Sequence, residues 1–410
     1  MTITPRKPDV TPRVFVGRQP IFRRDHSIYG YELLFRSDAL TNSARMDGNN
    51  ATAQVIHNAL LEIGIDDLVG GHYAFINMPR DILLSGMTTL LPPGRIVIEV
   101  LENEAVDEAL VKAVAEHVAR GFAVALDDFV YSPQWEALLR HASIIKFDVR
   151  SSNAEEIVRQ LDLMRGHNYK LLAEKVETEA EFQRYRDLGF DYFQGYFFSK
   201  PAIVSQDRLP DNHVALLQLL AVLQDPDVAI KEVEKLITQT VTLNYKLFKY
   251  LNSAFLGKSR TIQSIHQAIV YLGLNHIRQL ASLITLMGVD DKPSELVRAG
   301  LVRAKLCELL CMHARRPNPE GYFIVGLFSI LEALMQHPLD QILAKLPLPA
   351  HVTAGLLHRE GAEGAALDCA IACEQCDWKR IRFEGMDPGE LSSAYLDAIK
   401  WSTEISTLLE

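Results

Sequence analysis

Eight short apolar runs occupy the first half of this 410-residue chain, and segments of helical length separate most of them. Alternation of this kind is typical of repeated β-α units, which build parallel sheets and, with eight strands, closed barrels. Only RRDHS separates the first two runs, so these two should form an antiparallel hairpin. We therefore predict an α/β barrel of the TIM type with an antiparallel first hairpin. The runs lie at 14–22, 28–35, 72–78, 95–101, 122–129, 143–149, 169–176 and 191–198.

The alternation stops after residue 201, and from residue 214 apolar residues recur at helical spacing to the end of the chain. The second half is therefore predicted to be an all-α helical bundle. Within the first half, helices are predicted at 49–64 and 103–121, each ending at a glycine. We expect a flexible leader at 1–12, the barrel domain at 13–203, a linker at 204–212 and the helical domain at 213–410.

Composition and charge exclude several classes of protein. The net charge of −10 argues against a binder of nucleic acid polymers, which needs a basic face to neutralise phosphates. The first 13 residues have no apolar segment of a signal peptide, and the longest apolar stretches are too short or too charged to span a bilayer. We expect a cytoplasmic protein that does not contact a membrane.

Five cysteines all lie in the second half of the chain, at positions 307, 311, 369, 373 and 376. One interpretation is a thiolate metal site. Their spacing departs from the usual CxxC pairs, however, and the last three lie in a stretch of helical character, where free cysteines serve as small buried apolar residues. We favour buried, structural cysteines.

Polar side chains recur where the predicted strands end. In a β/α barrel these strand ends share one face, so the side chains should converge there. Carboxylates and an amide suit Mg²⁺ or Mn²⁺, and two such ions about 4 Å apart can activate water and stabilise a leaving oxygen in phosphodiester hydrolysis. A single strand-end carboxylate could instead be a cap or a rim salt bridge; a set that recurs on seven strands favours a metal site. The candidate ligands are Glu32, Asn77, Glu99, Asp127, Asp128 and Glu174; Lys146 could orient water, and Arg36 could bind a phosphate.

The motifs QPIF, YELLFR, FIN, IEVLE, LDDF, KFD, AEKVE and FQGYFFSKP occur in this order over residues 14–201. This series resembles the EAL domains, the family of cyclic-di-GMP phosphodiesterases. The resemblance implies one metal ion held by Glu32, Asn77, Glu99 and Asp127, and a second held by Asp128 and Glu174. It also implies that Lys146, Glu174 and Asp128 serve catalysis and that Gln19, Arg36 and Gln194 contact cyclic-di-GMP.

The chain departs from the family pattern at three places. The signature reads Glu-Leu-Leu, a small change. Segment 129–135 (FVYSPQW) stands where active members carry a Gly-Thr-Gly type loop, so a flexible turn is replaced by a bulky one stiffened by proline, and Glu102 loses its usual partner there. Lys175 stands where a glycine is usual. Because catalysis is sensitive to misplacement of about 1 Å, these changes favour ligand binding over turnover.

The second half contains the segments LNYKLFKYLNSA, SIHQAIVYLGLNHIRQLASL and FIVGLFSILEALM. These segments are similar to HDOD domains, relatives of the HD phosphohydrolases that lack the metal site. GLFS at 326–329 stands where an active relative would have a His-Asp pair.

Three interpretations of the chain remain open. The first is a cyclic-di-GMP sensor with weak or no hydrolysis that acts on a signalling protein through the helical domain. The second is an active phosphodiesterase that produces pGpG, and the third is a scaffold that binds no nucleotide. The resemblance implies a homodimer through the barrels, although the altered 129–135 segment makes a monomer the alternative.

Overall fold

The computed structural model describes residues 14–37, 64–86, 88, 91–151, 154–164, 166, 168–195, 211–254, 262–289 and 294–409. The predicted leader at 1–12, most of the helix predicted at 49–64, and the linker at 204–210 lie outside these residues. The domain boundaries drawn from the sequence therefore stay predictions. No helix in these described ranges is long and apolar enough to cross a membrane.

Eight strands close into a barrel in sequence order. Strands β1 (Val14–Arg23) and β2 (Ile28–Ser37) form the expected antiparallel hairpin, and every later neighbour is parallel until β8 closes on β1. The predicted barrel with an antiparallel first hairpin is thus confirmed. The remaining strands are β3 (Tyr73–Asn77), β4 (Ile96–Val100), β5 (Ala123–Leu126), β6 (Ile144–Asp148), β7 (Lys170–Glu174) and β8 (Tyr192–Phe193).

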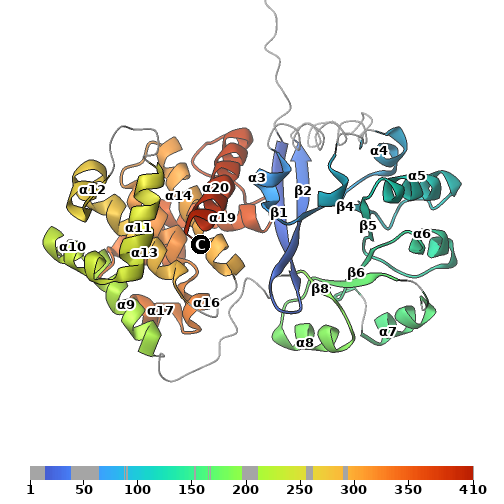
Figure 1. Ribbon diagram of the computed structural model, residues 1–410, viewed down its shortest axis with the longest axis horizontal. Helices are drawn as coiled ribbons and strands as arrows, with labels where there is room; N and C mark the ends of the chain where they lie inside the picture. Colours follow the sequence, from blue (N-terminus) through green and yellow to red (C-terminus); the bar gives the residue numbers. More distant parts are fainter. Residues whose placement is uncertain are drawn as a thin grey trace, which may run out of the picture.

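Helices cover the outside of the barrel (Figure 1). They form because apolar residues recur on one face, and two of them also have polar caps at their first turns. Asp107 accepts a hydrogen bond from the Leu110 amide at 2.9 Å before α5, and Thr178 with Glu181 forms a capping box before α8. These helices are α3 (Ile65–Val69), α4 (Arg80–Ser85), α5 (Glu108–Ala119), α6 (Glu136–Leu139), α7 (Ala154–Leu163) and α8 (Glu179–Asp187).

The second half of the chain is helical, as predicted. Its longest helices, α14 (Ser294–His313) and α20 (Pro388–Leu409), pack against each other and against α15 (Pro319–Phe328) and α19 (Gly361–Glu374) around one apolar core. The other helices are α9 (Asp211–Gln224), α10 (Ile230–Gln239), α11 (Val241–Ala254), α12 (Ile265–Leu272), α13 (Leu274–Met287), α16 (Leu331–Met335), α17 (Leu339–Leu343) and α18 (Ala350–His358).

Four of the five cysteines are buried in this helical core, and Cys376 is partly exposed. Burial raises the pKa of the Cys311 thiol to about 11. The four therefore pack as small apolar side chains, which is the role we favoured from their spacing.

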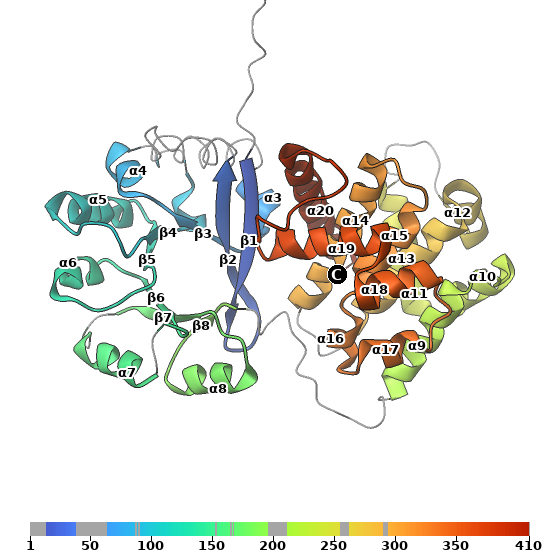
Figure 2. The same ribbon diagram turned by 180° about the vertical axis from the view of Figure 1, so that it is seen from behind.

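The helical domain packs against the outer side of the β1–β2 hairpin through α14, α19 and α20 (Figures 1 and 2). Tyr31 of β2 is fully buried at this contact. Its hydroxyl donates to Glu295 Oε2 at 2.8 Å and accepts from Arg298 Nη1 at 3.0 Å, while the Arg18 guanidinium lies 4.8 Å from the centre of its ring. A polar cluster of residues from both domains thus fixes α14 beside the carboxyl end of the barrel.

Candidate functional site

Lys146 lies among the strand-end carboxylates that the sequence singled out. Its side chain is completely buried, rising from β6 toward the carboxyl face of the barrel. Four acidic side chains from four other parts of the barrel surround the ammonium group. The distances from Lys146 Nζ are 2.5 Å to Glu99 Oε1, 2.7 Å to Asp127 Oδ1, 2.9 Å to Glu174 Oε1 and 3.5 Å to Glu32 Oε2.

The register of the strands explains this convergence. Asn77 pairs with Glu99 across β3 and β4, and Asp148 pairs with Glu174 across β6 and β7, so residues at the ends of neighbouring strands lie side by side. Alternation along β2 points Glu32 into the barrel mouth, whereas its neighbour Tyr31 points out to the helical domain.

Three amide side chains complete the cluster. Gln194 Nε2 donates to Glu32 Oε2 at 2.8 Å and to Gln19 Oε1 at 2.9 Å, and Asn77 Nδ2 donates to Glu32 Oε1 at 3.2 Å. Gln19 is the partner of Glu32 across the hairpin. The structure therefore brings Gln19, Asn77 and Gln194 to the predicted site, while the side chain of Arg36 lies outside the described residues.

Burial dominates the electrostatics of this cluster. It raises the pKa of Glu99 well above its ordinary value and that of Glu174 to about 8, and the positive charge of Lys146 only partly opposes both shifts. For Lys146 itself burial lowers the pKa, but the surrounding carboxylates outweigh burial and raise it, so the ammonium stays charged. Four acidic side chains around one lysine leave an excess of negative charge when all are ionised.

The oxygen atoms of the cluster fit a divalent cation in type. Asn77 Oδ1 and Glu99 Oε2 are buried and accept no hydrogen bond from the described residues, whereas Glu99 Oε1 is paired with the Lys146 ammonium group. Buried oxygens of this kind are satisfied by hard cations such as Mg²⁺ or Mn²⁺. With Lys146 among them, however, no three acidic, histidine or cysteine side chains of the described ranges meet at one point suited to an ion.

A second lysine approaches the cluster from the loop after β7. Lys175 Nζ lies 2.5 Å from Asp148 Oδ2 and 3.9 Å from Asp128 Oδ1. Burial raises the pKa of Asp128, and the charge of Lys175 partly opposes this. Asp148 ends one of the predicted strands with a polar side chain of the type that suits a metal, but it was not among the candidate ligands.

Packing holds the altered segment 129–135 in place. Phe129 and Trp135 are buried, and the Phe129 ring meets the rings of Trp135 and Phe147 nearly edge-on, at 5.8 and 6.0 Å between centroids. The Tyr131 amide donates to Gln160 Oε1 at 2.8 Å, and the Phe129 amide donates to the Lys146 carbonyl at 2.9 Å. The segment is thus anchored in the barrel core on both sides of its proline.

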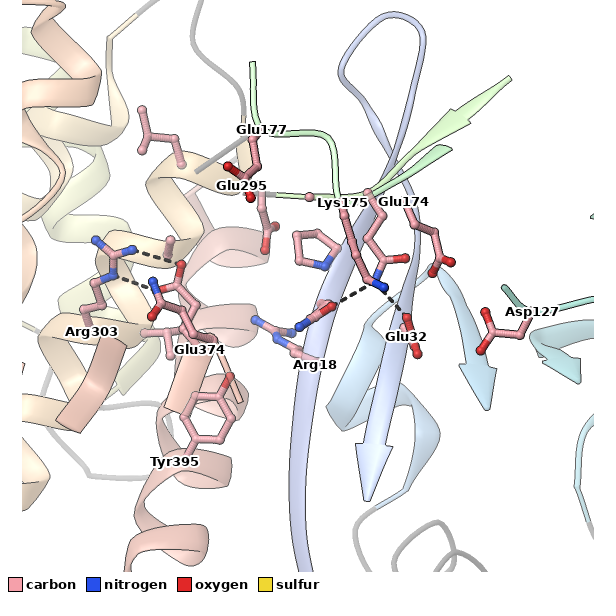
Figure 3. A pocket seen from close by; sticks show the side chains of 18 of the residues that line it. Arg18, Glu32, Asp127, Glu174, Lys175, Glu177, Glu295, Arg303, Glu374 and Tyr395 are labelled. Atoms are coloured by element: carbon pink, nitrogen blue, oxygen red, sulfur yellow. Dashed lines mark hydrogen bonds and ion pairs between the residues drawn. The ribbon is translucent and has the colours of Figure 1, made fainter. Parts of the chain in front are cut away.

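A cavity of about 640 Å³ opens beside the carboxylates, between the barrel and the helical domain. Figure 3 shows Arg303, Glu374 and Tyr395 of the helical domain opposite Arg18 and Glu32 of the hairpin. Glu374 accepts two hydrogen bonds from the Arg303 guanidinium, at 2.7 and 2.9 Å. Sequence analysis missed the residues of this wall because they have no motif and are more than 250 positions from the barrel residues that they face.

A closed β/α barrel with this lysine-centred acidic cluster, followed by a helical domain, is the architecture expected from the EAL and HDOD motifs. The family model for EAL domains matches residues 77–201, and the model for HDOD domains matches residues 209–346. The cyclic di-GMP phosphodiesterase CdgJ of Vibrio cholerae is 36% identical over 412 residues, which cover 98% of this chain and 95% of that protein. The protein YuxH of Bacillus subtilis is 34% identical, covering 95% of this chain and 98% of its own length.

The chain therefore belongs to the family of EAL–HDOD proteins, as the resemblance of its motifs indicated. A weaker likeness links it to the solved structure of a standalone EAL protein from Vibrio cholerae O395 in a c-di-GMP bound form. That match has 23% identity and a TM-score of 0.36, and it covers 47% of this chain and 93% of the other. A likeness at this level supports no statement about the site.

Proposed function

We propose that this protein is a cyclic-di-GMP signalling protein that binds the dinucleotide in the cavity between its two domains, with weak or no hydrolysis. The observation that carries the proposal is the position of the cavity, which joins the acidic cluster at the barrel mouth to a wall supplied by α14, α19 and α20. Its volume lies within the range of about 300–1,000 Å³ that small-molecule sites occupy. A ligand bound there contacts both domains.

A phosphodiester approaching this cluster is repelled unless a cation offsets the carboxylates. Mg²⁺ or Mn²⁺ would supply that charge and lower the pKa of a bound water. The residues that would hold one or two such ions are Glu32, Asn77, Glu99, Asp127, Asp128 and Glu174. Lys146, buried and charged, would orient the water, and Gln19, Arg36 and Gln194 would contact the dinucleotide.

One feature supports weak turnover. The segment 129–135, where active members carry a flexible loop, is held by aromatic packing and cannot easily reposition Asp127 and Asp128. Catalysis loses about 10²-fold for a displacement of about 1 Å, whereas ligand binding tolerates more.

The second candidate function is hydrolysis of cyclic-di-GMP to pGpG. Its support is the similarity to CdgJ, which is named a cyclic di-GMP phosphodiesterase and matches nearly the whole chain. In either case, the contact between α14 and the hairpin provides a route by which the bound state reaches the helical domain. We propose that this domain binds a signalling protein, and that a homodimer, if formed, uses the barrels.

Calorimetric titration of cyclic-di-GMP with Mn²⁺ present, followed by chromatography of the sample for pGpG, tests the proposal. We expect binding with little or no product. Substantial product would favour the phosphodiesterase, and no binding would leave the scaffold interpretation. Glu32→Ala should abolish binding or turnover without unfolding the chain. Glu116→Ala, at an exposed position of α5, serves as the control and should leave both unchanged.

A further inference from the structure

The side chain of Lys175 adds a second positive charge to the acidic cluster. Its ammonium nitrogen lies 2.5 Å from Asp148 Oδ2 and 3.9 Å from Asp128 Oδ1, at the edge of the interdomain cavity. The preceding residue, Glu174, is one of the carboxylates around Lys146. The acidic side chains at this end of the barrel thus pair with two lysines, Lys146 from β6 and Lys175 from the residue after β7.

The surroundings hold Lys175 in this place. Its backbone has a φ of +60°, in the left-handed region that residues other than glycine rarely adopt. Asp148 provides a fixed partner: its Oδ1 accepts hydrogen bonds from the amides of Arg150 at 2.7 Å and Ser151 at 3.2 Å, which leaves Oδ2 for the lysine. The ammonium group is therefore held beside Asp148, although the Lys175 side chain is 55% exposed to solvent.

Asp128 pairs with Lys175 at the longer distance of 3.9 Å. Its Oδ1 is buried and accepts no hydrogen bond from the residues that the structure describes. Its backbone is also left-handed, with a φ of +40°, so the side chain is directed by a strained turn. The nearby charge of Lys175 partly offsets a carboxylate that would otherwise need a cation.

We propose that the Lys175 ammonium group takes the place of a second metal ion, beside Asp128 and Asp148. The inference rests on the proposed function, since it concerns the cations of that same site. An ammonium group neutralises carboxylates but does not bind and acidify a water as a divalent ion does. The site then holds its divalent cation at Glu32, Asn77, Glu99 and Asp127 alone, and the dinucleotide is bound more readily than it is cleaved.

The test is the number of Mn²⁺ ions bound per chain, measured by equilibrium dialysis and elemental analysis of the full-length protein. Lys175→Gly should bind about one ion more than the wild type, and its Mn²⁺ resonance spectrum should show coupling between two nearby ions. Glycine suits the backbone at this position, so the variant should fold. Lys170→Ala is the matched control: Lys170 also pairs with an aspartate, Asp191 at 3.1 Å, and is similarly exposed, but it does not line the cavity.

A second substitution locates the additional ion. Asp128→Asn should remove it from the Lys175→Gly protein and should leave the ion count of the wild type unchanged. An equal count in wild type and Lys175→Gly overturns the proposal; if that variant also binds cyclic-di-GMP more weakly, Lys175 contacts the ligand instead. Failure of the proposed function is distinguishable, because it would appear as no cyclic-di-GMP binding by any variant, whatever its metal count.

Discussion

Replacing Lys146 with methionine would remove the charge that holds the acidic cluster together. The ammonium group is completely buried and lies within 3 Å of oxygens of Glu99, Asp127 and Glu174. Removing one partner of a buried ion pair costs about 3–5 kcal/mol, because the remaining charge has lost its partner in a poorly solvated place. We expect a loss of this size in the free energy of unfolding near neutral pH.

Proton uptake limits that loss and makes it depend on pH. Glu99 and Glu174 already have raised pKa values, so the folded protein holds more protons than the unfolded chain above pH 4.5, and stability falls as the pH rises toward 8. Without Lys146 these pKa values rise further. Because both groups hold their protons below about pH 8 in the wild type and in the variant, the loss should be the same at pH 5 and pH 7.5 and should grow above pH 8, by up to about 1.4 kcal/mol per pH unit and proton.

Scanning calorimetry at pH 7.5 and pH 9 in chelator, and at pH 7.5 in Mn²⁺, measures these differences. For a domain of this size the loss corresponds to a fall of roughly 6–20 °C in the transition of the barrel at pH 7.5. Mn²⁺ should restore more stability to the variant than to the wild type, because the ion replaces the missing charge. The exposed Lys112→Met is the control and should change little. A loss below about 1 kcal/mol at both pH values, or a greater loss at pH 7.5 than at pH 9, would refute the reasoning.

Three other predictions concern the pH dependence of metal binding and the packing of the helical domain. Because burial raises the pKa of the proposed ligand Glu99 well above its ordinary value, Mn²⁺ must displace a proton from it. Affinity should therefore rise with pH by up to about tenfold per unit, and calorimetry in two buffers should detect proton release. Gly326→Ala places a Cβ about 2.4 Å from a backbone carbonyl oxygen of α14 and should lower the free energy of unfolding by about 1–3 kcal/mol, as measured by calorimetry. Gly288→Ala is the control and should cost less, because its Cβ meets its neighbours at 3.5 Å or more. Tyr31→Phe leaves the buried Glu295 without a 2.8 Å donor and should cost about 1–3 kcal/mol; a single calorimetric transition should then separate into two, and an unchanged trace would contradict a role in domain docking.

Much of the barrel and its site could be predicted because the signals are local. Apolar runs of strand length alternate with helical segments, and the polar residues at the strand ends must meet once the barrel closes. Lys146 and its carboxylate partners were found in this way. The hairpin was predictable from the five residues between its strands, which are too few for a parallel crossover.

Other parts of the site could not be predicted in the same way. Lys175 was recognised as unusual, but its pairing with Asp148 depends on a left-handed backbone and on a carboxylate fixed by two amides. The effect of segment 129–135 was expected from its proline and aromatic residues, yet its anchoring depends on how Phe129 and Trp135 pack in the barrel.

The sequence by itself determined the class of fold, the order of the two domains and the set of acidic residues with their lysine. It could do so because strand periodicity and strand-end position are properties of short segments. Only the tertiary structure decided that the acids are drawn onto Lys146 and that Glu295, Arg303 and Tyr395 of the helical domain complete the cavity. Contacts between residues more than 250 positions apart depend on how two finished surfaces fit together, and no local pattern in the chain encodes that fit.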